Sequence, residues 1–342
     1  GTVKTIAIYG AGVFLPFVCL CLLLARDGVF SRFWFWTFTY AHSYVAIISL
    51  SQGFHWLCQH LKTAFPVAVG FWLLGLMGLL GGLYDKTLRE RTLFVAGLWG
   101  FAFLGTATGF YFRGHYFILV LPAFSLLVGL AVEALAKNLQ KWIPANICKT
   151  VTVGLFAAFF CWSTFFQQEF FFILPGTEVV RAIYRGYPFV ESLVVSEYIR
   201  AHSTPDERIV VIGSEPEIYF YSQRHSATGY IYIYALNEPQ PNAGLMQLDM
   251  INEIESTSPE YLVWIGFDNS WLIWPTSDTT LSDWAAQYIQ KFYTKTGIAN
   301  TTADGSTVFL WGDDARNYHG PIGNHITVYQ RRDAAGIPRK QN

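Results

Sequence analysis

One short polar segment of the sequence, residues 111–116, combines side chains that could bind a phosphate group. It reads Tyr111, Phe112, Arg113, Gly114, His115 and Tyr116, and lies between two long stretches that carry no other charge. Arg113 offers a planar set of N–H donors that matches phosphate oxygens, and His115 could add a donor. A simpler interpretation is that Arg113 ends a membrane helix and extends its charge to the interface. Residue type alone favours the simpler interpretation.

A pair of carboxylates, Glu215 and Glu217, is the second candidate site. The two residues flank Pro216 directly after an expected strand, a position where α/β sheets often bind ligands. Carboxylates in exposed loops are nevertheless commoner than carboxylates that bind or catalyse. The same region has no glycine-rich phosphate loop and no nucleophile motif, so no residue is assigned as catalytic.

Metal binding is not expected from the sequence. His55 and His60 are five residues apart, and this spacing does not align them on one helical face as a spacing of four would. Asp313 and Asp314 are a still weaker pair. The five cysteines lack the paired spacing of a zinc or redox site and are interpreted as small apolar residues; they are Cys19, Cys21, Cys58, Cys148 and Cys161.

The composition shows that part of the chain needs a lipid environment. Of its 342 residues, 52% are hydrophobic and 14% are charged, whereas soluble domains carry about 25% charged residues. Charged residues are sparse before Glu169 and ordinary in number after Pro175. We therefore expect a membrane region over residues 1–175 and a soluble domain over 176–342. The net charge of −1 and the lack of basic clusters argue against nucleic acid as a partner.

Five segments are long and apolar enough to be membrane helices. About 20 apolar residues are needed for a helix to cross a bilayer, because lipid cannot satisfy backbone polar groups. The expected spans are Ile6–Ala25, Thr63–Tyr84, Thr92–Phe112, Tyr116–Val132 and Thr150–Gln168. The predicted fold class is a membrane α-helical bundle of about five transmembrane helices, followed by a soluble α/β domain.

Basic residues in the short loops predict the orientation of these spans. Loops 85–91 and 136–149 each contain three Lys or Arg residues, and such residues are retained on the cytoplasmic side. With five crossings, this orientation places loop 26–62, the turn at Arg113 and the C-terminal domain outside.

The outer loop 26–62 is too aromatic for a freely solvated connection. Residues 30–44 include eight aromatic side chains, and Trp and Tyr favour the membrane interface because their rings are apolar and their tips polar. Apolar residues then recur at helical spacing from Ile47 to Leu61. We expect two short helices along the outer surface.

Beyond Pro175, expected helices and strands alternate, which predicts a small sheet covered by helices. The expected strands are Arg208–Ile212, Tyr230–Tyr234, Tyr261–Ile265, Thr307–Trp311 and Ile326–Gln330. The expected helices are Val190–His202, Gly244–Ser256 and Leu281–Thr294.

Three segments of the chain also match a known pattern, in the same order. They are the aromatic segment 28–44, the phrase Arg113-Gly114-His115-Tyr116-Phe117 with Leu121-Pro122-Ala123, and the segment Ile212–Arg224. Together they resemble the polyprenyl-phosphate-dependent glycosyltransferases of the GT-C type, which include protein mannosyltransferases and aminoarabinose transferases. In that family the three segments are an aromatic outer loop, the start of a late transmembrane helix and the beginning of a C-terminal outer domain.

The resemblance implies transfer of a sugar from a polyprenyl-phosphate carrier, the donor substrate, to an acceptor on the outer face of a bacterial inner membrane. The residues that would bind the leaving lipid phosphate are Arg113, His115 and Tyr116. A fixed guanidinium stabilises the negative charge that develops on such a phosphate. The residues that would line the approach of the carrier are Trp34, Trp36, Tyr40 and Tyr44.

One feature of the family has no counterpart in these residues. The family carries its acidic general base in the first outer loop of an N-terminal membrane half, and Asp27 lies at the wrong end of the pattern to replace it. We therefore expect the C-terminal portion of such an enzyme, with a missing half or a partner membrane subunit supplying the base. The alternative is a non-catalytic structural or accessory subunit of a larger membrane complex. A transporter is disfavoured because the spans lack charged residues.

Overall fold

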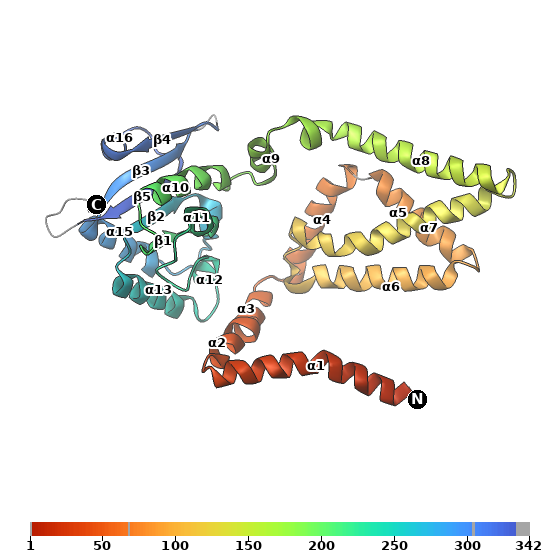
Figure 1. The fold of residues 1–342 in the computed structure, drawn as a ribbon, viewed down its shortest axis with the longest axis horizontal. Coiled ribbons are helices and arrows are strands. Elements are labelled where there is room, and N and C mark those ends of the chain that lie inside the picture. The colour runs from red at the N-terminus through yellow and green to blue at the C-terminus, as the bar shows by residue number, and fades with distance from the viewer. Residues whose placement is uncertain (1, 68, 303–304, 333–342) are drawn as a thin grey trace. The chain divides into compact units, whose positions relative to one another are not determined.

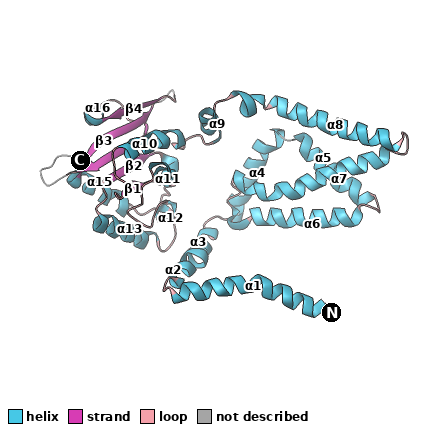
Figure 2. Ribbon diagram, viewed as in Figure 1, coloured by secondary structure: helices cyan, strands magenta, loops and turns pink. Residues whose placement is uncertain are grey.

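The chain folds into two compact units, Gly1–Gln168 and Glu169–Asn342. A computed structural model describes residues 2–67, 69–302 and 305–332. In this described part of the chain the first unit is helical, and all strands belong to the second unit (Figures 1 and 2). The two units are described separately below.

The first unit consists of long helices joined by short helical turns. Its elements are α1 (Thr2–Arg26), α2 (Phe30–Trp34), the π-helix η1 (Phe35–Tyr40), α3 (Ala41–Val45), α4 (Leu50–Val67), α5 (Val69–Tyr84), α6 (Arg89–Thr106), the 3-10 helices η2 (Thr108–Phe110) and η3 (Gly114–Val120), α7 (Leu121–Leu139) and α8 (Ala145–Phe166).

Among the described residues, three helices are long and apolar enough to cross a membrane: Thr2–Arg26, Gly114–Leu139 and Ala145–Phe166. Helix α5 is equally apolar but has 16 residues, about 24 Å at 1.5 Å per residue. A bilayer core is about 30 Å thick. These candidate spans agree with the expected membrane region, whereas the number of five spans stays a prediction.

The expected span Thr63–Tyr84 falls on two described helices, α4, which ends at Val67, and α5, which begins at Val69. Residue 68 lies outside the described residues, so the extent of this span stays a prediction. The helical character expected for loop 26–62 is confirmed by α2, η1, α3 and the start of α4.

Helices α5 and α7 approach each other so closely that their backbones touch. A Cβ atom at Gly78 would lie 1.8 Å from the carbonyl oxygen of Leu127 and 2.9 Å from the backbone nitrogen of Ala131. Gly75 and Gly82 are three and four residues from Gly78, which places them on the same face of α5, and both are buried. In lipid, where hydrophobic burial does not drive helices together, small residues allow the close packing that does.

The second unit contains the sheet and the helices that cover it. Its elements are the π-helix η4 (Glu169–Ile173), α9 (Gly176–Ile183), α10 (Phe189–Ala201), β1 (Ile209–Ile212), α11 (Glu217–Ser222), α12 (Tyr234–Asn237), α13 (Ala243–Thr257), β2 (Tyr261–Gly266), α14 (Asp268–Trp271), α15 (Thr280–Phe292), β3 (Tyr293–Thr301), β4 (Thr307–Trp311), α16 (Gly312–Arg316) and β5 (Asn324–Arg331).

The sheet has the strand order β1-β2-β5-β3-β4. Strands β1 and β2 are parallel, and the other neighbouring pairs are antiparallel. Helices α10 and α11 contribute Val195, Ile199 and Ile218 to a core that covers one face. Side chains that point to the other face, such as Val210 and Leu262, are also fully buried. Both faces of the parallel pair are therefore covered, as expected for an α/β domain.

One strand assignment from the sequence is wrong, and one strand was missed. Residues 230–234 do not form a strand, because the backbone N–H groups of Tyr230 and Ile233 donate to the hydroxyls of Thr228 and Ser214, and a short helix starts at Tyr234. Strand β3 was not expected, because its sequence is polar and contains Gly297. The remaining expected strands and helices are confirmed to within a few residues.

We predict that Gly78→Leu destabilises the first unit strongly. Overpacking a tight interface usually costs about 1–3 kcal/mol, and here the obstacle is the Leu127 backbone, so the cost should reach at least about 3 kcal/mol. The measurement is the thermal unfolding midpoint in detergent, which should fall by roughly 6 °C or more. Gly97→Leu is the matched control, because a Cβ there meets nothing within 4 Å. An equal shift in both variants would contradict close α5–α7 packing.

Candidate functional site

The segment that carries Arg113 follows a tight turn after α6. Gly109, Phe110 and Phe112 have φ angles of 75°, 58° and 43°, a left-handed conformation that costs about 1–3 kcal/mol for residues with a side chain. This turn ends α6 at Thr106, short of the expected Phe112. Arg113 is extended, and η3 starts at the next residue. The turn thus separates Arg113 from α6.

An aromatic cluster surrounds Arg113. Its guanidinium carbon lies 5.2 Å from the centre of the Tyr111 ring, a cation–π contact. The buried Tyr111 ring stacks on Tyr44, with centres 4.5 Å apart and planes 10° apart, and the Tyr44 and Tyr116 hydroxyls are 3.5 Å apart. His115 is exposed, and its ring meets Tyr116 edge-on. The structure therefore brings the phosphate-binding candidates together with the aromatic loop.

A row of four aromatic rings extends from this cluster. Trp36, Tyr40 and Tyr44 are spaced four residues apart and share one helical face. The ring centres of Trp36 and Tyr40 are 5.5 Å apart, and those of Tyr40 and Tyr44 are 6.4 Å apart. The row ends on Tyr111. Trp34, the fourth expected residue of the loop, instead packs on Phe38 at 4.5 Å.

An apolar cavity of about 540 Å³ begins beside Arg113, at Gly114. Its walls come from α4, α5, η3, α7 and α8, and its lining is His60, Leu61, Phe71, Trp72, Gly114, Phe117, Val120, Leu121, Phe124, Ser125, Val128, Phe156 and Phe160. This volume lies in the range of small-molecule sites. The sequence did not indicate the cavity, because residues that line it and residues that face lipid are equally apolar.

Glu215 and Glu217 follow β1 at the carboxyl end of the parallel pair, as expected from the sequence. Glu215 is 2% exposed, and the Ser270 hydroxyl donates to its Oε2 at 2.7 Å. Burial raises the pKa of Glu215 to about 8, with a smaller contribution from the charge of Glu217, while the Ser270 hydrogen bond opposes the rise. Burial also raises the pKa of Glu217. Glu215 is thus a protonated, buried acid at neutral pH rather than an exposed loop carboxylate.

Arg224, the last residue of the segment Ile212–Arg224, makes contacts within the fold. Its guanidinium is buried and donates to the Ser203 hydroxyl and to the carbonyls of Arg200, Ser203, Ser222 and Gln223. These carbonyls belong to the ends of α10 and α11, where a positive charge is favourable. Arg224 therefore joins two helix ends and does not face a ligand.

The residues considered for metal binding have other contacts. His55 Nε2 is 2.9 Å from the side-chain amide of Gln59, and Asp313 pairs with Arg316. Among the residues that the structure describes, no three His, Cys, Asp or Glu side chains are grouped to hold a metal ion.

Comparison of the chain with protein-family models, curated proteins and solved structures gives no significant match. The assignment of a function therefore depends on the geometry of the Arg113 cluster and the cavity next to it.

We predict that Glu215 makes the second unit less stable as the pH rises. An acid whose pKa is raised by folding, here from 4.5 to about 8, stabilises the fold fully below pH 4.5 and loses that contribution as the pH rises through 8. Thermal unfolding of the wild type and of Glu215→Gln, measured from pH 5 to pH 9, should show the variant gaining several degrees relative to the wild type. The exposed Glu197→Gln is the control. Parallel pH profiles for all three proteins would rule the effect out.

Proposed function

We propose that this chain is the C-terminal part of a GT-C type membrane glycosyltransferase, which moves a sugar from a polyprenyl-phosphate carrier to an acceptor. In such a transfer the acceptor hydroxyl attacks the sugar carbon, a base takes its proton and the carrier phosphate leaves with the bonding electrons. The carboxylate that acts as this base is supplied by an N-terminal half or by a partner membrane subunit.

The observation that carries this proposal is that the cationic side chain of Arg113 is next in sequence to a residue that lines an apolar cavity. Arg113 adjoins Gly114, which lines the cavity together with residues of a candidate membrane span. A polyprenyl phosphate is complementary to this arrangement, because it has an anionic head and a long apolar tail. A charged head beside lipid needs a cation that is held in place, and the contact with Tyr111 holds the guanidinium.

The remaining candidate residues have consistent roles in this proposal. Arg113, His115 and Tyr116 contact the leaving phosphate, and the guanidinium contributes most because the negative charge grows during transfer. The row of rings from Trp36 through Tyr40 and Tyr44 forms a surface along which an isoprenoid chain reaches the cavity. The cluster then lies on the outer side of a bacterial inner membrane, the side to which the basic loops assign the second unit.

A structural or accessory membrane subunit is the second candidate function. Helix α1 has no buried residue over its 25 residues, so most of its surface is open to lipid or to helices of another subunit. In that role the Arg113 cluster does not need to bind a phosphate, and the binding experiment below separates the two functions.

We predict that Arg113→Ala weakens binding of a polyprenyl phosphate by about 10–100-fold, because hydrogen bonds to charged groups contribute about 1.5–3 kcal/mol. Binding of the uncharged polyprenol should not change. Affinities would be measured in detergent micelles, with Arg113→Lys as a partial replacement and Arg26→Ala, at the exposed end of α1, as control. If Arg113→Ala binds the phosphate as tightly as the wild type, the proposed function fails.

We further predict that Gly114→Leu discriminates against long carriers. A Cβ at Gly114 meets nothing within 4 Å, so the backbone accepts the change while the new side chain narrows the cavity. Binding of a long polyprenyl phosphate should weaken about tenfold, and binding of a short isoprenyl phosphate should stay the same. Gly100→Leu, also in open space but outside the cavity lining, should alter neither. Equal weakening for both chain lengths would show that the tail does not occupy this cavity.

A further inference from the structure

A second apolar cavity, of about 150 Å³, continues the first cavity, which begins at Gly114. Its walls come from α5, α7 and α8, and its lining is Leu74, Met77, Ala131, Val132, Leu135, Thr152, Leu155, Phe156 and Phe159. On α7 the lining of the first cavity ends at Val128, and that of the second begins one helical turn later, at Ala131. The second cavity therefore lies further along α7, and further from Arg113, than the first.

Of the described lining residues, Phe156 of α8 is common to both cavities. It is half-buried, and it shares a helical face with Thr152 and Phe160, which lie four residues away on either side. Phe160 lines the first cavity, and Thr152 lines the second. The side chain of Phe156 therefore lies at the boundary between the two cavities.

The second cavity is suited to an apolar occupant. Thr152 is the polar side chain among its described lining residues, and its hydroxyl donates within the helix to the carbonyl of Cys148 at 2.8 Å. The remaining lining residues are aliphatic, aromatic or methionine. In another protein an apolar cavity of roughly 150 Å³ stays dry and binds benzene. By that comparison the second cavity has room for about one isoprene unit.

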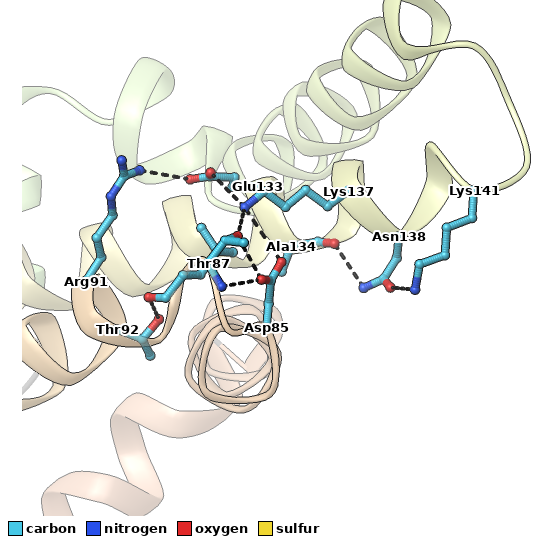
Figure 3. Close-up of polar contacts among 10 residues, drawn as sticks. Asp85, Thr87, Arg91, Thr92, Glu133, Ala134, Lys137, Asn138 and Lys141 are labelled. Atoms are coloured by element: carbon cyan, nitrogen blue, oxygen red, sulfur yellow. Dashed lines mark hydrogen bonds and ion pairs between the residues drawn. The ribbon is translucent and has the colours of Figure 1, made fainter.

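Contacts that do not involve Phe156 fix the helices around it. Helices α5 and α7 touch at Gly78, and Figure 3 shows Lys137 of α7 reaching the loop after α5, where it donates to the Thr87 hydroxyl at 2.6 Å. On α8, the Phe159 ring packs edge-on against Phe71 of α5, with ring centres 5.0 Å apart. A smaller side chain at position 156 should therefore leave open space, because surroundings that cannot close in leave a cavity.

We propose that Phe156 determines how much of the carrier's isoprenoid tail the protein holds. The tail enters beside Gly114, follows the first cavity along α7 and stops at the Phe156 ring. Leu121 and Phe160, which line the first cavity, are more than half exposed, so the rest of a longer tail leaves there into lipid. The inference rests on the proposed function, because it takes a polyprenyl phosphate as the occupant. Phe156 is then a residue that sets specificity for tail length and does not contact the reacting phosphate.

The test is photolabelling of the full chain in detergent with a series of isoprenyl phosphates that lengthen by one isoprene unit and carry a diazirine at the tail end. Peptide mass spectrometry locates the label. In the wild type we expect label at Phe124 and Val128 of the first cavity, and longer tails should not carry it to Leu135 or Thr152 of the second. In Phe156→Ala the label of the longer members should shift to Leu135 and Thr152.

Phe160→Ala is the matched control, because Phe160 is on the same helix but lines the first cavity alone; its labelling should match the wild type. If Phe156→Ala does not fold, the milder Phe156→Leu should give the same shift in smaller amount. Label that stays in the first cavity in both Phe156 variants, or that already reaches Leu135 and Thr152 in the wild type, refutes the role of Phe156 and leaves the proposed function standing. If no member of the series labels the first cavity of the wild type, both proposals fail.

Discussion

The contact between the backbones of α5 and α7 at Gly78 is the constraint on which the first unit depends. The two helices are parallel and nearest at Gly78, Leu127 and Ala131, and the cavity lies nearer their N-terminal ends, between Phe71 and Trp72 of α5 and Val120 and Phe124 of α7. A side chain at Gly78 would separate the helices and move both cavity walls. The shape of the candidate site is therefore determined by a residue that does not line it.

The second unit depends on a different principle, the satisfaction of buried polar groups. The buried guanidinium of Arg224 donates to the carbonyls and the hydroxyl around it. Glu215 accepts hydrogen bonds from the Ser270 hydroxyl and the Ser214 backbone, but burial outweighs both and raises its pKa. In both places a buried polar side chain has its partners within the unit.

The sequence predicted features that depend on local composition. Apolar stretches located the helices of the first unit, and the alternation after Pro175 located most of the sheet. The prediction failed where a contact with another part of the chain determines the backbone conformation. The backbone N–H groups of Tyr230 and Ile233 donate to side-chain hydroxyls instead of to a neighbouring strand. The Arg113 segment and the aromatic loop were identified separately, but spacing along the chain does not reveal that Tyr44 stacks on Tyr111. The cavity was missed for the same reason.

The strand order also determines when the second unit can form during protein synthesis. Strand β5 is the last strand that the structure describes, but it lies inside the sheet, between β2 and β3. Until residues 324–331 have left the ribosome, β2 and β3 have no partner on the sides where β5 will pair, and unpaired strand edges favour aggregation. Because nascent chains emerge at about 5–20 residues per second, the first unit can enter the membrane seconds before this sheet is complete. A nonsense mutation just before Asn324 would therefore remove the centre of the sheet rather than an edge.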